Sequence, residues 1–344
     1  MQKTKKWVLS LCVTGTLLST MTFQAFAANS PEELHPGDTA YVDVSVSTQW
    51  TTNGRFQVRD IDAPSLSNPV DPWKWSANMQ DSEVRRWLTG KLETQAVFGS
   101  KVVILQEVGD WVQVAVEGQP TPRNPLGYPG WMPKSQLTAD DRLESLNDAA
   151  FIMVSSPTAW LYDGKALNQQ FMEVSFNTRL PIVKDFGDVV MVATPDDGNK
   201  FIKKEDVATY QNENEFPKAT PEELMKTAKK FLGLRYLWAG VSGFGFDCSG
   251  FTYSIHKAYG ITIPRDSGPQ SKAGKVVNKD EIQPGDLLFF ASNNGTGSVH
   301  HVSMYIGDGL MIHAPNASKN VEIIPLNTPG YIEEFSGARR YWEQ

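Results

Sequence analysis

One cysteine and a group of histidines carry the residue types from which a covalent catalyst can be built. Cys248 lies in the glycine-rich segment 240–260, and three of the five histidines lie in the segment 300–315. A thiol becomes a nucleophile when an imidazole accepts its proton, and that imidazole needs a further group to hold its orientation. This combination predicts acyl transfer through a thioester intermediate.

The surroundings of Cys248 favour a reactive thiol. Glycines interrupt the segment 240–260 up to Gly250, after which apolar residues recur at every fourth position. This pattern predicts a helix that begins close to Cys248. Because the unpaired N–H groups at a helix start favour an anion, we expect them to favour the thiolate. The alternative is a buried, inert cysteine, but the polar neighbours Asp247 and Ser249 argue against it.

The histidine-rich segment is expected to form a hairpin. Apolar residues alternate on both sides of the turn 307–309, and His301 and His313 are nearly symmetric about it. Their rings then share one face of the hairpin, directly opposed or one diagonal apart. One ring can take the thiol proton while the other fixes its tautomer. We expect His300, which faces the other way, and His256, in the middle of a helix, to be bystanders.

Metal chemistry is the alternative use of these histidines. A zinc site on His301 and His313 lacks an evident third ligand, and no His-Glu-x-x-His motif occurs. We therefore expect no metal and no cofactor.

The first 27 residues have the pattern of a secretory signal peptide. Three lysines precede an apolar stretch, and Ala25-Phe26-Ala27 provides a cleavage site with small residues. A membrane anchor is the alternative, but serines and threonines interrupt the apolar stretch. No later segment reaches the roughly 20 apolar residues needed to span a bilayer. We expect a secreted protein associated with the cell wall, in which Cys248 is the only remaining cysteine.

The composition excludes several classes of protein. Of the 344 residues, 40% are hydrophobic and 21% are charged, which is typical of a globular protein and not of a disordered one. The net charge of −7 gives no reason to expect nucleic-acid binding. We expect a monomer, with two or three domains at this length.

Two segments with the same order of features, 40–138 and 148–210, precede the last domain. Each contains alternating apolar residues, a Gly-Asp turn, a second alternating stretch and an aromatic residue before a short final segment. Such alternation predicts small antiparallel β-barrels. The two segments resemble tandem bacterial SH3-like domains. The first copy also has a partly helical insertion at 71–95 and a Pro/Gly-rich loop that displays Tyr128. Long insertions of this kind are often functional, and the alternative is a surface loop without a role.

The third domain spans 218–344 and starts with a helix. Thr220, Pro221 and Glu223 have the types and spacing of an N-cap, an N1 proline and a capping-box glutamate. Since helical and strand patterns both follow, we expect an α+β fold.

Five motifs in this third domain resemble, in type and order, those of NlpC-type papain-like bacterial cell-wall peptidases. They are FDCSGF (246–251), PRDSGPQ (264–270), PGDLLFF (284–290), HVSMYIGDG (301–309) and MIHAP (311–315). The segment RYLWAG (235–240) matches as well. With the tandem SH3-like domains, the chain looks most similar to the Bacillus-type γ-D-glutamyl-L-diamino-acid peptidases. These enzymes cut murein stem peptides, of the L-Ala-γ-D-Glu-L-Lys or diaminopimelate type, that have a free N-terminal L-Ala.

The resemblance implies a papain-like C-terminal catalytic domain behind the two small SH3-like β-barrels, and a role for each matched position. Cys248 is the nucleophile, His301 the base and His313 the orienting group, while Tyr236 helps to stabilise the oxyanion. The implied substrate-binding residues are Asp247, Ser249, Trp238 and Ser267. No motif places Glu93 and Tyr128 of the first SH3-like domain: we expect them to close the far end of the pocket, and plain surface exposure is the alternative.

Three questions stay open at this level. Arg265 is either a clamp for a substrate carboxylate or part of a structural ion pair. The barrels either bind wall polymer or shape the active site, so the substrate is either a freed peptide or intact peptidoglycan. A wall-binding protein without activity and an acyltransferase are the alternatives from other classes.

Overall fold

The computed structural model describes residues 34–54 and 58–343. The predicted signal peptide, residues 1–27, lies outside these ranges. Within them, no helix combines the length and the apolar character needed to cross a membrane.

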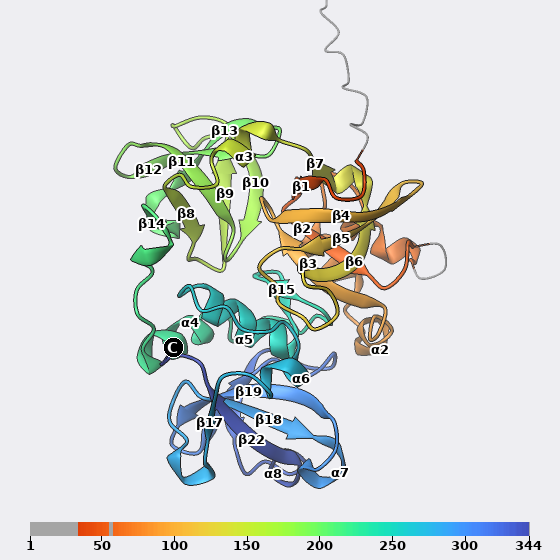
Figure 1. Ribbon diagram of the computed structural model, residues 1–344, viewed down its shortest axis with the longest axis vertical. Helices are drawn as coiled ribbons and strands as arrows, with labels where there is room; N and C mark the ends of the chain where they lie inside the picture. Colours follow the sequence, from red (N-terminus) through yellow and green to blue (C-terminus); the bar gives the residue numbers. More distant parts are fainter. Residues whose placement is uncertain (1–33, 55–57, 344) are drawn as a thin grey trace, which may run out of the picture. The chain divides into compact units, whose positions relative to one another are not determined.

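The first part of the described chain is a sheet of seven short strands, in the order β3-β2-β6-β5-β4-β1-β7 (Figure 1). The strands are β1 (Thr39–Val42), β2 (Val46–Trp50), β3 (Leu92–Val97), β4 (Lys101–Val108), β5 (Trp111–Val116), β6 (Tyr128–Pro133) and β7 (Leu137–Thr138). The predicted Gly-Asp turn joins β4 to β5. The insertion is partly helical, as expected, with α1 (Pro72–Asn78) and α2 (Ser82–Arg86). Asp71 and Asp81 cap these two helices.

The second part repeats this topology. After α3 (Asp141–Ser145), its seven strands pair in the order β10-β9-β13-β12-β11-β8-β14, the same order as in the first sheet when each is counted from its first strand. They are β8 (Phe151–Val154), β9 (Thr158–Tyr162), β10 (Gln170–Ser175), β11 (Arg179–Asp185), β12 (Val189–Thr194), β13 (Gly198–Lys203) and β14 (Val207–Tyr210). In the described residues each sheet is an open series of pairs, and no pairing between its two end strands closes it into the predicted barrel.

The third part combines helices with a six-stranded sheet, in the order β17-β22-β18-β19-β20-β21. The predicted capping box opens its first helix, α4 (Pro221–Lys229). The remaining helices are α5 (Cys248–Lys257), α6 (Ser267–Gln270), α7 (Ser292–Gly295) and α8 (Tyr331–Glu334). The strands are β15 (Val241–Ser242) and β16 (Gly245–Phe246), which form a small hairpin, and β17 (Lys275–Val277), β18 (Leu287–Ala291), β19 (Val299–Gly307), β20 (Leu310–His313), β21 (Glu322–Pro325) and β22 (Phe335–Arg340).

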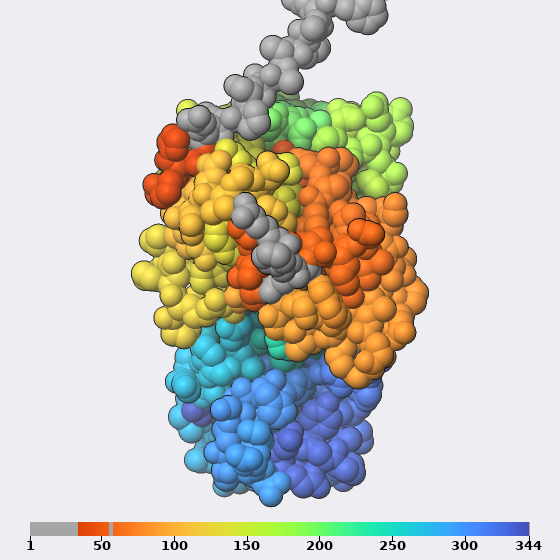
Figure 2. All heavy atoms as spheres, turned by 90° about the vertical axis from the view of Figure 1, so that its right-hand side faces the viewer, coloured from red at the N-terminus to blue at the C-terminus, as the bar shows by residue number. Residues whose placement is uncertain are grey.

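The insertion of the first part bonds directly to the third part. Arg85 of α2 is buried and donates to the carbonyl of Ala317 at 2.7 Å. Arg235 donates to the Ser76 carbonyl, and the Trp238 indole donates to that of Leu92 at 3.1 Å. In Figure 2 the orange surface of the first part adjoins the blue surface of the third. The insertion is therefore placed beside the segment that precedes Cys248.

Candidate active site

Cys248 is the first residue of α5, as the sequence predicts. Asp247 is the N-cap, and its Oδ1 accepts a hydrogen bond of 2.6 Å from the Gly250 N–H. Gly250 is required because the helix start packs on the backbone of the preceding loop. A Cβ atom added there would lie 2.0 Å from the Gly240 carbonyl oxygen. The small residues of this segment thus allow the nucleophile to sit where loop and helix meet.

The two predicted histidines meet on the hairpin of β19 and β20. Met304 pairs with Ile312, so His301 and His313 lie diagonally across the two strands, as one of the two expected registers requires. His301 Nε2 lies 2.8 Å from His313 Nδ1. Tyr331 of α8 packs against both rings, with centroid distances of 5.6 and 5.2 Å. The histidine pair is therefore held by the sheet register and by an aromatic contact.

Glu322 continues this line of polar groups. It is the direct cross-strand partner of His313, and its Oε1 lies 3.5 Å from His313 Nε2. In the part of the chain that the structure describes, His313 Nε2 forms no hydrogen bond, and Glu322 is the acidic group that faces it, so a proton on Nε2 is directed towards Glu322. His313 Nδ1 then accepts from His301 Nε2, and His301 Nδ1 is left free to accept the thiol proton.

Burial sets the charge state of the three reactive groups. It raises the pKa of the Cys248 thiol to about 12, assisted by the nearby Asp247 carboxylate. The Val302 and Ser249 backbone N–H groups and the more distant Arg265 act in the opposite sense but do not outweigh burial. Burial also lowers the pKa of His301 well below its ordinary value and that of His313 to about 4. Burial therefore opposes the thiolate that the helix start was expected to favour, and it opposes the charged form of both imidazoles as well.

Arg265 belongs to a structural ion pair. It is 1% exposed, and its Nη2 donates to Asp247 Oδ2 at 2.8 Å. It also donates to the hydroxyl of Ser249 at 3.0 Å and, through Nε, to the hydroxyl of Thr94 in β3 at 3.0 Å. Arg265 thus ties the N-cap of α5 to the first sheet, and these bonds occupy its Nε and Nη1 donors and one of the two on Nη2.

A cavity of about 740 Å³ opens over Cys248. Nine of the ten site residues predicted from the sequence line it: Cys248, His301, Tyr236, Asp247, Ser249, Trp238, Ser267, Glu93 and Tyr128. His313 is fully buried behind His301. His300, expected to be a bystander, also lines the cavity, where it is exposed and lies 3.1 Å from Glu334. His256 is buried, and its Nδ1 bonds to the Thr252 carbonyl, away from the cavity lining.

The first sheet supplies one acidic side of this cavity. Tyr128 begins β6, and its hydroxyl donates to Asp266 Oδ2 at 2.9 Å, which joins the first sheet to the third part. Glu93 of β3 forms a two-fold hydrogen bond with Arg123. Burial raises the pKa of Asp266. Two carboxylates and a phenol therefore face the cavity near the nucleophile.

Three residues of the site were not singled out from the sequence. Asp266 lies inside the motif PRDSGPQ, between two residues that were considered, so the motif itself could have indicated it. Tyr331 and Glu322 lie outside every motif, and only the strand register and the packing of α8 bring them to the histidines.

The described residues contain no group of three or more His, Cys, Asp or Glu side chains placed to hold a metal ion.

Comparison with known proteins places this site in a family. The chain is 50% identical over 330 residues to a γ-D-glutamyl-L-lysine dipeptidyl-peptidase of Bacillus cereus, a match that covers 95% of this chain and 98% of the relative. Residues 233–340 match the model of the NlpC/P60 family. The chain belongs to the NlpC/P60 family. A second relative with the same name, from Bacillus subtilis, is 43% identical over 74% of this chain and 82% of its own length.

The structural comparison agrees with the sequence matches. The crystal structure of an NlpC/P60 family protein from Bacillus cereus superimposes with a TM-score of 0.85 at 51% identity, covering 89% of this chain and 100% of that one. Residues 154–210 match the model of the YKFC SH3b2 domain. The chain therefore combines a papain-like NlpC/P60 domain with an SH3b domain in its second part.

Proposed function

We propose that this chain is a cysteine peptidase that hydrolyses the bond between γ-D-glutamate and an L-diamino acid, lysine or meso-diaminopimelate, in murein stem peptides. The substrate has a free N-terminal L-Ala, and L-Ala-γ-D-Glu is released. The observation that carries the proposal is the cavity in which Cys248 and His301 face a side that bears Glu93 and Asp266. The names of the two Bacillus relatives support this substrate class.

The chemistry follows from the order of the polar groups. His301 Nδ1 takes the proton of the Cys248 thiol as the sulfur attacks the γ-carbonyl carbon. The resulting imidazolium is stabilised through His313, whose far nitrogen faces Glu322. The Cys248 backbone N–H and Tyr236 stabilise the oxyanion. When the intermediate collapses, His301 gives the proton to the leaving amine, and water then hydrolyses the thioester.

The acidic side of the cavity accounts for the free amino group of the substrate. An ammonium group needs carboxylate or hydroxyl partners when it loses water, and Glu93, Tyr128 and Asp266 provide them. Asp247 and Ser249 are held by Arg265, so they shape the adjoining subsite while Trp238 and Ser267 line it. A stem peptide still attached to glycan has no such amine, so this arrangement favours freed peptides over intact wall.

The first part of the chain is, in this proposal, a second SH3-like domain. Its strand order is identical to that of the part that matches an SH3b model, which supports a duplicated domain. Its role is to shape the active site, because β3 and β6 contribute Glu93 and Tyr128. We also propose that the protein is exported by its first 27 residues and acts as a monomer outside the cell, associated with the wall.

The mechanism is tested by replacing the nucleophile. Cys248→Ala should reduce release of L-Lys from L-Ala-γ-D-Glu-L-Lys by at least roughly a thousandfold, since the covalent route is lost. Cys248→Ser serves as the matched variant and should be similarly impaired. Full activity in either variant would overturn the mechanism, and transfer of the acyl group to an added amine in place of water would indicate an acyltransferase.

The substrate is tested with three forms of the same peptide. The purified tripeptide should be cut. Its N-acetylated form should be cut at least about tenfold more slowly, because the acidic side chains then face no cation. Intact sacculi should release little diamino acid. The measurement is chromatography of the released amine. Efficient attack on sacculi would favour a wall-lytic endopeptidase, while binding to sacculi without cleavage of any form would favour a wall-binding protein.

A further inference from the structure

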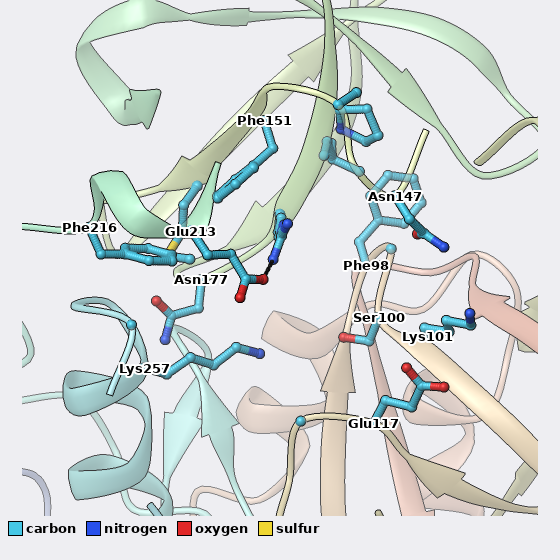
Figure 3. A pocket seen from close by; sticks show the side chains of 18 of the residues that line it. Phe98, Ser100, Lys101, Glu117, Asn147, Phe151, Asn177, Glu213, Phe216 and Lys257 are labelled. Carbon is cyan, nitrogen blue, oxygen red and sulfur yellow. Dashed lines mark hydrogen bonds and ion pairs between the residues drawn. The ribbon is translucent and has the colours of Figure 1, made fainter. Parts of the chain in front are cut away.

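A second cavity, of about 720 Å³, lies where the two sheets approach the C-terminal end of α5 (Figure 3). Its walls come from the turn before β4 and the end of β5 in the first sheet, from β8 and β11 in the second, and from α5. Lys257 is the last residue of α5 and Cys248 the first, so the two are separated by nine helical steps, roughly 14 Å. No residue lines both this cavity and the one over Cys248.

Two charged groups in this cavity have no partner of opposite charge among the described residues. Lys101 pairs with Glu144 at 2.8 Å, and Arg179 pairs with Glu213. The Lys257 ammonium and the Glu117 carboxylate, by contrast, form no hydrogen bond or ion pair in the part of the chain that the structure describes. Figure 3 shows Lys257 extending from the α5 side and Glu117 rising from the first sheet beside Ser100 and Lys101; Glu117 is exposed, and Lys257 is partly buried.

The position of Lys257 is unfavourable without a ligand. Its side chain is partly buried, its ammonium lies 5.9 Å from the centre of the Tyr253 ring, and the nearby charge that acts on it is that of Arg179, which has the same sign. Burial and this cation together lower the pKa of the Lys257 ammonium to about 8. Asn177, which is 3% exposed, also lines the cavity, and its Oδ1 has no partner. Buried polar groups of this kind are normally satisfied, so the cavity has the features of a site that takes a polar molecule.

We propose that this cavity binds a small zwitterion, an amino acid or a short peptide with free amino and carboxyl groups. Its carboxylate pairs with Lys257 and its ammonium with Glu117. The rings of Phe98, Phe151 and Phe216, which line the same cavity, pack against an apolar side chain of the ligand. The separation of the two unpaired charges across one cavity is what selects a zwitterion over a simple anion, because an anion would leave Glu117 unpaired.

The test is calorimetric titration of the full chain carrying Cys248→Ala with the dipeptide L-Ala-L-Phe. We expect saturable binding that weakens at least about tenfold when the dipeptide is N-acetylated or when its carboxyl group is amidated, since each change removes one charge-assisted pair. Lys257→Met and Glu117→Gln should each weaken binding by a similar factor. Glu107→Gln, which changes a carboxylate of β4 that pairs with Lys134 outside the cavity, should leave it unchanged.

Asp266→Asn separates this site from the active site. Binding at the cavity over Cys248 would weaken in that variant, whereas binding at the second cavity should keep its affinity. The proposal is overturned if the dipeptide fails to bind, if Lys257→Met and Glu117→Gln bind it as tightly as the parent, or if inorganic phosphate displaces it with equal affinity. Failure of the peptidase proposal would leave these outcomes unaffected, because none of them depends on turnover.

Discussion

Replacing Arg265 by methionine gives the sharpest test of how the nucleophile helix is held. The guanidinium is 1% exposed and donates to both oxygens of Asp247, at 2.8 and 3.2 Å. Methionine fills a similar volume but leaves the Asp247 carboxylate buried without its cation. Removal of one partner from a buried ion pair costs about 3–5 kcal/mol. The lost hydrogen bonds to Ser249 and Thr94 act in the same direction and are contained in this range.

The expected loss is large against the total stability of a domain, which is about 5–15 kcal/mol. The free energy of unfolding is measured by urea titration, followed by tryptophan fluorescence and far-UV circular dichroism. Arg86→Met is the matched control, because its pair with Glu83 is 56% and 69% exposed and is worth at most about 1 kcal/mol. Combining Arg265→Met with Asp247→Asn should recover part of the loss, because no charge is then stranded and asparagine still caps the helix.

Two results would refute this reasoning. One is a destabilisation by Arg265→Met below about 1 kcal/mol, the range of a solvated pair. The other is a large loss of kcat/KM with unchanged unfolding, which would identify Arg265 as a clamp for a substrate carboxylate. Arg265→Lys sharpens the distinction, since a lysine retains the charge but cannot reach Asp247, Ser249 and Thr94 together.

Three further predictions concern the reactive groups. The rate at which iodoacetamide alkylates Cys248 should rise about tenfold per pH unit between pH 7 and 9. The reason is that burial raises the thiol pKa to about 12, so the reactive thiolate fraction grows with pH. A rate that does not depend on pH would reveal a stable thiolate. The value of kcat/KM should stay constant as the pH falls from 7 to 6 and should decline only at lower pH. Burial lowers the pKa of His301, and only its neutral ring accepts a proton. A decline in kcat/KM centred near pH 6.5 would contradict this prediction. Glu322→Gln should lower kcat about tenfold and leave KM unchanged, as the loss of a group that orients a catalytic histidine does. A kcat equal to that of the parent, or a change in KM alone, would show that Glu322 does not support His313 and His301 in catalysis.

Local patterns were sufficient to predict how Cys248, His301 and His313 are placed. The helix start at Cys248 follows from glycines giving way to a helical apolar period, and the pairing of His301 with His313 follows from strand alternation about a short turn. Both depend on interactions between residues close in sequence. The repeated order of strands in the first two parts was visible for the same reason, as repeated alternation around Gly-Asp turns.

The remainder of the site depends on contacts between distant segments. Glu322 reaches His313 only because β21 pairs with β20, and Tyr331 reaches both rings only through the packing of α8. The choice between the two roles of Arg265 required its burial and its bond to Thr94, which is 171 residues away in the chain. Alternation predicts strands and turns but does not indicate whether the end strands of a sheet pair with each other, so the sequence could not decide whether the predicted barrels are closed.

The charge state of Cys248 illustrates how magnitude decides between opposing local effects. A helix N-terminus stabilises an anion by about 0.3–1 kcal/mol, and by about 2 kcal/mol in favourable buried geometry. Raising the thiol pKa from its ordinary 9.0 to about 12 corresponds to about 4 kcal/mol against the thiolate. Burial and the Asp247 carboxylate therefore prevail over the helix start that the sequence indicates.

The burial of Cys248 and His301 also bears on the order of events in catalysis. Because burial raises the pKa of the Cys248 thiol and lowers that of His301, separating charge between them before the substrate arrives is costly. The proton must move as the sulfur bonds to the carbonyl carbon, when the negative charge passes to an oxygen that the Cys248 N–H and Tyr236 can stabilise. Glu322 then matters most at that step, because only then does a positive charge exist for it to stabilise through His313. Its replacement should therefore act on kcat while leaving the binding of the peptide unchanged.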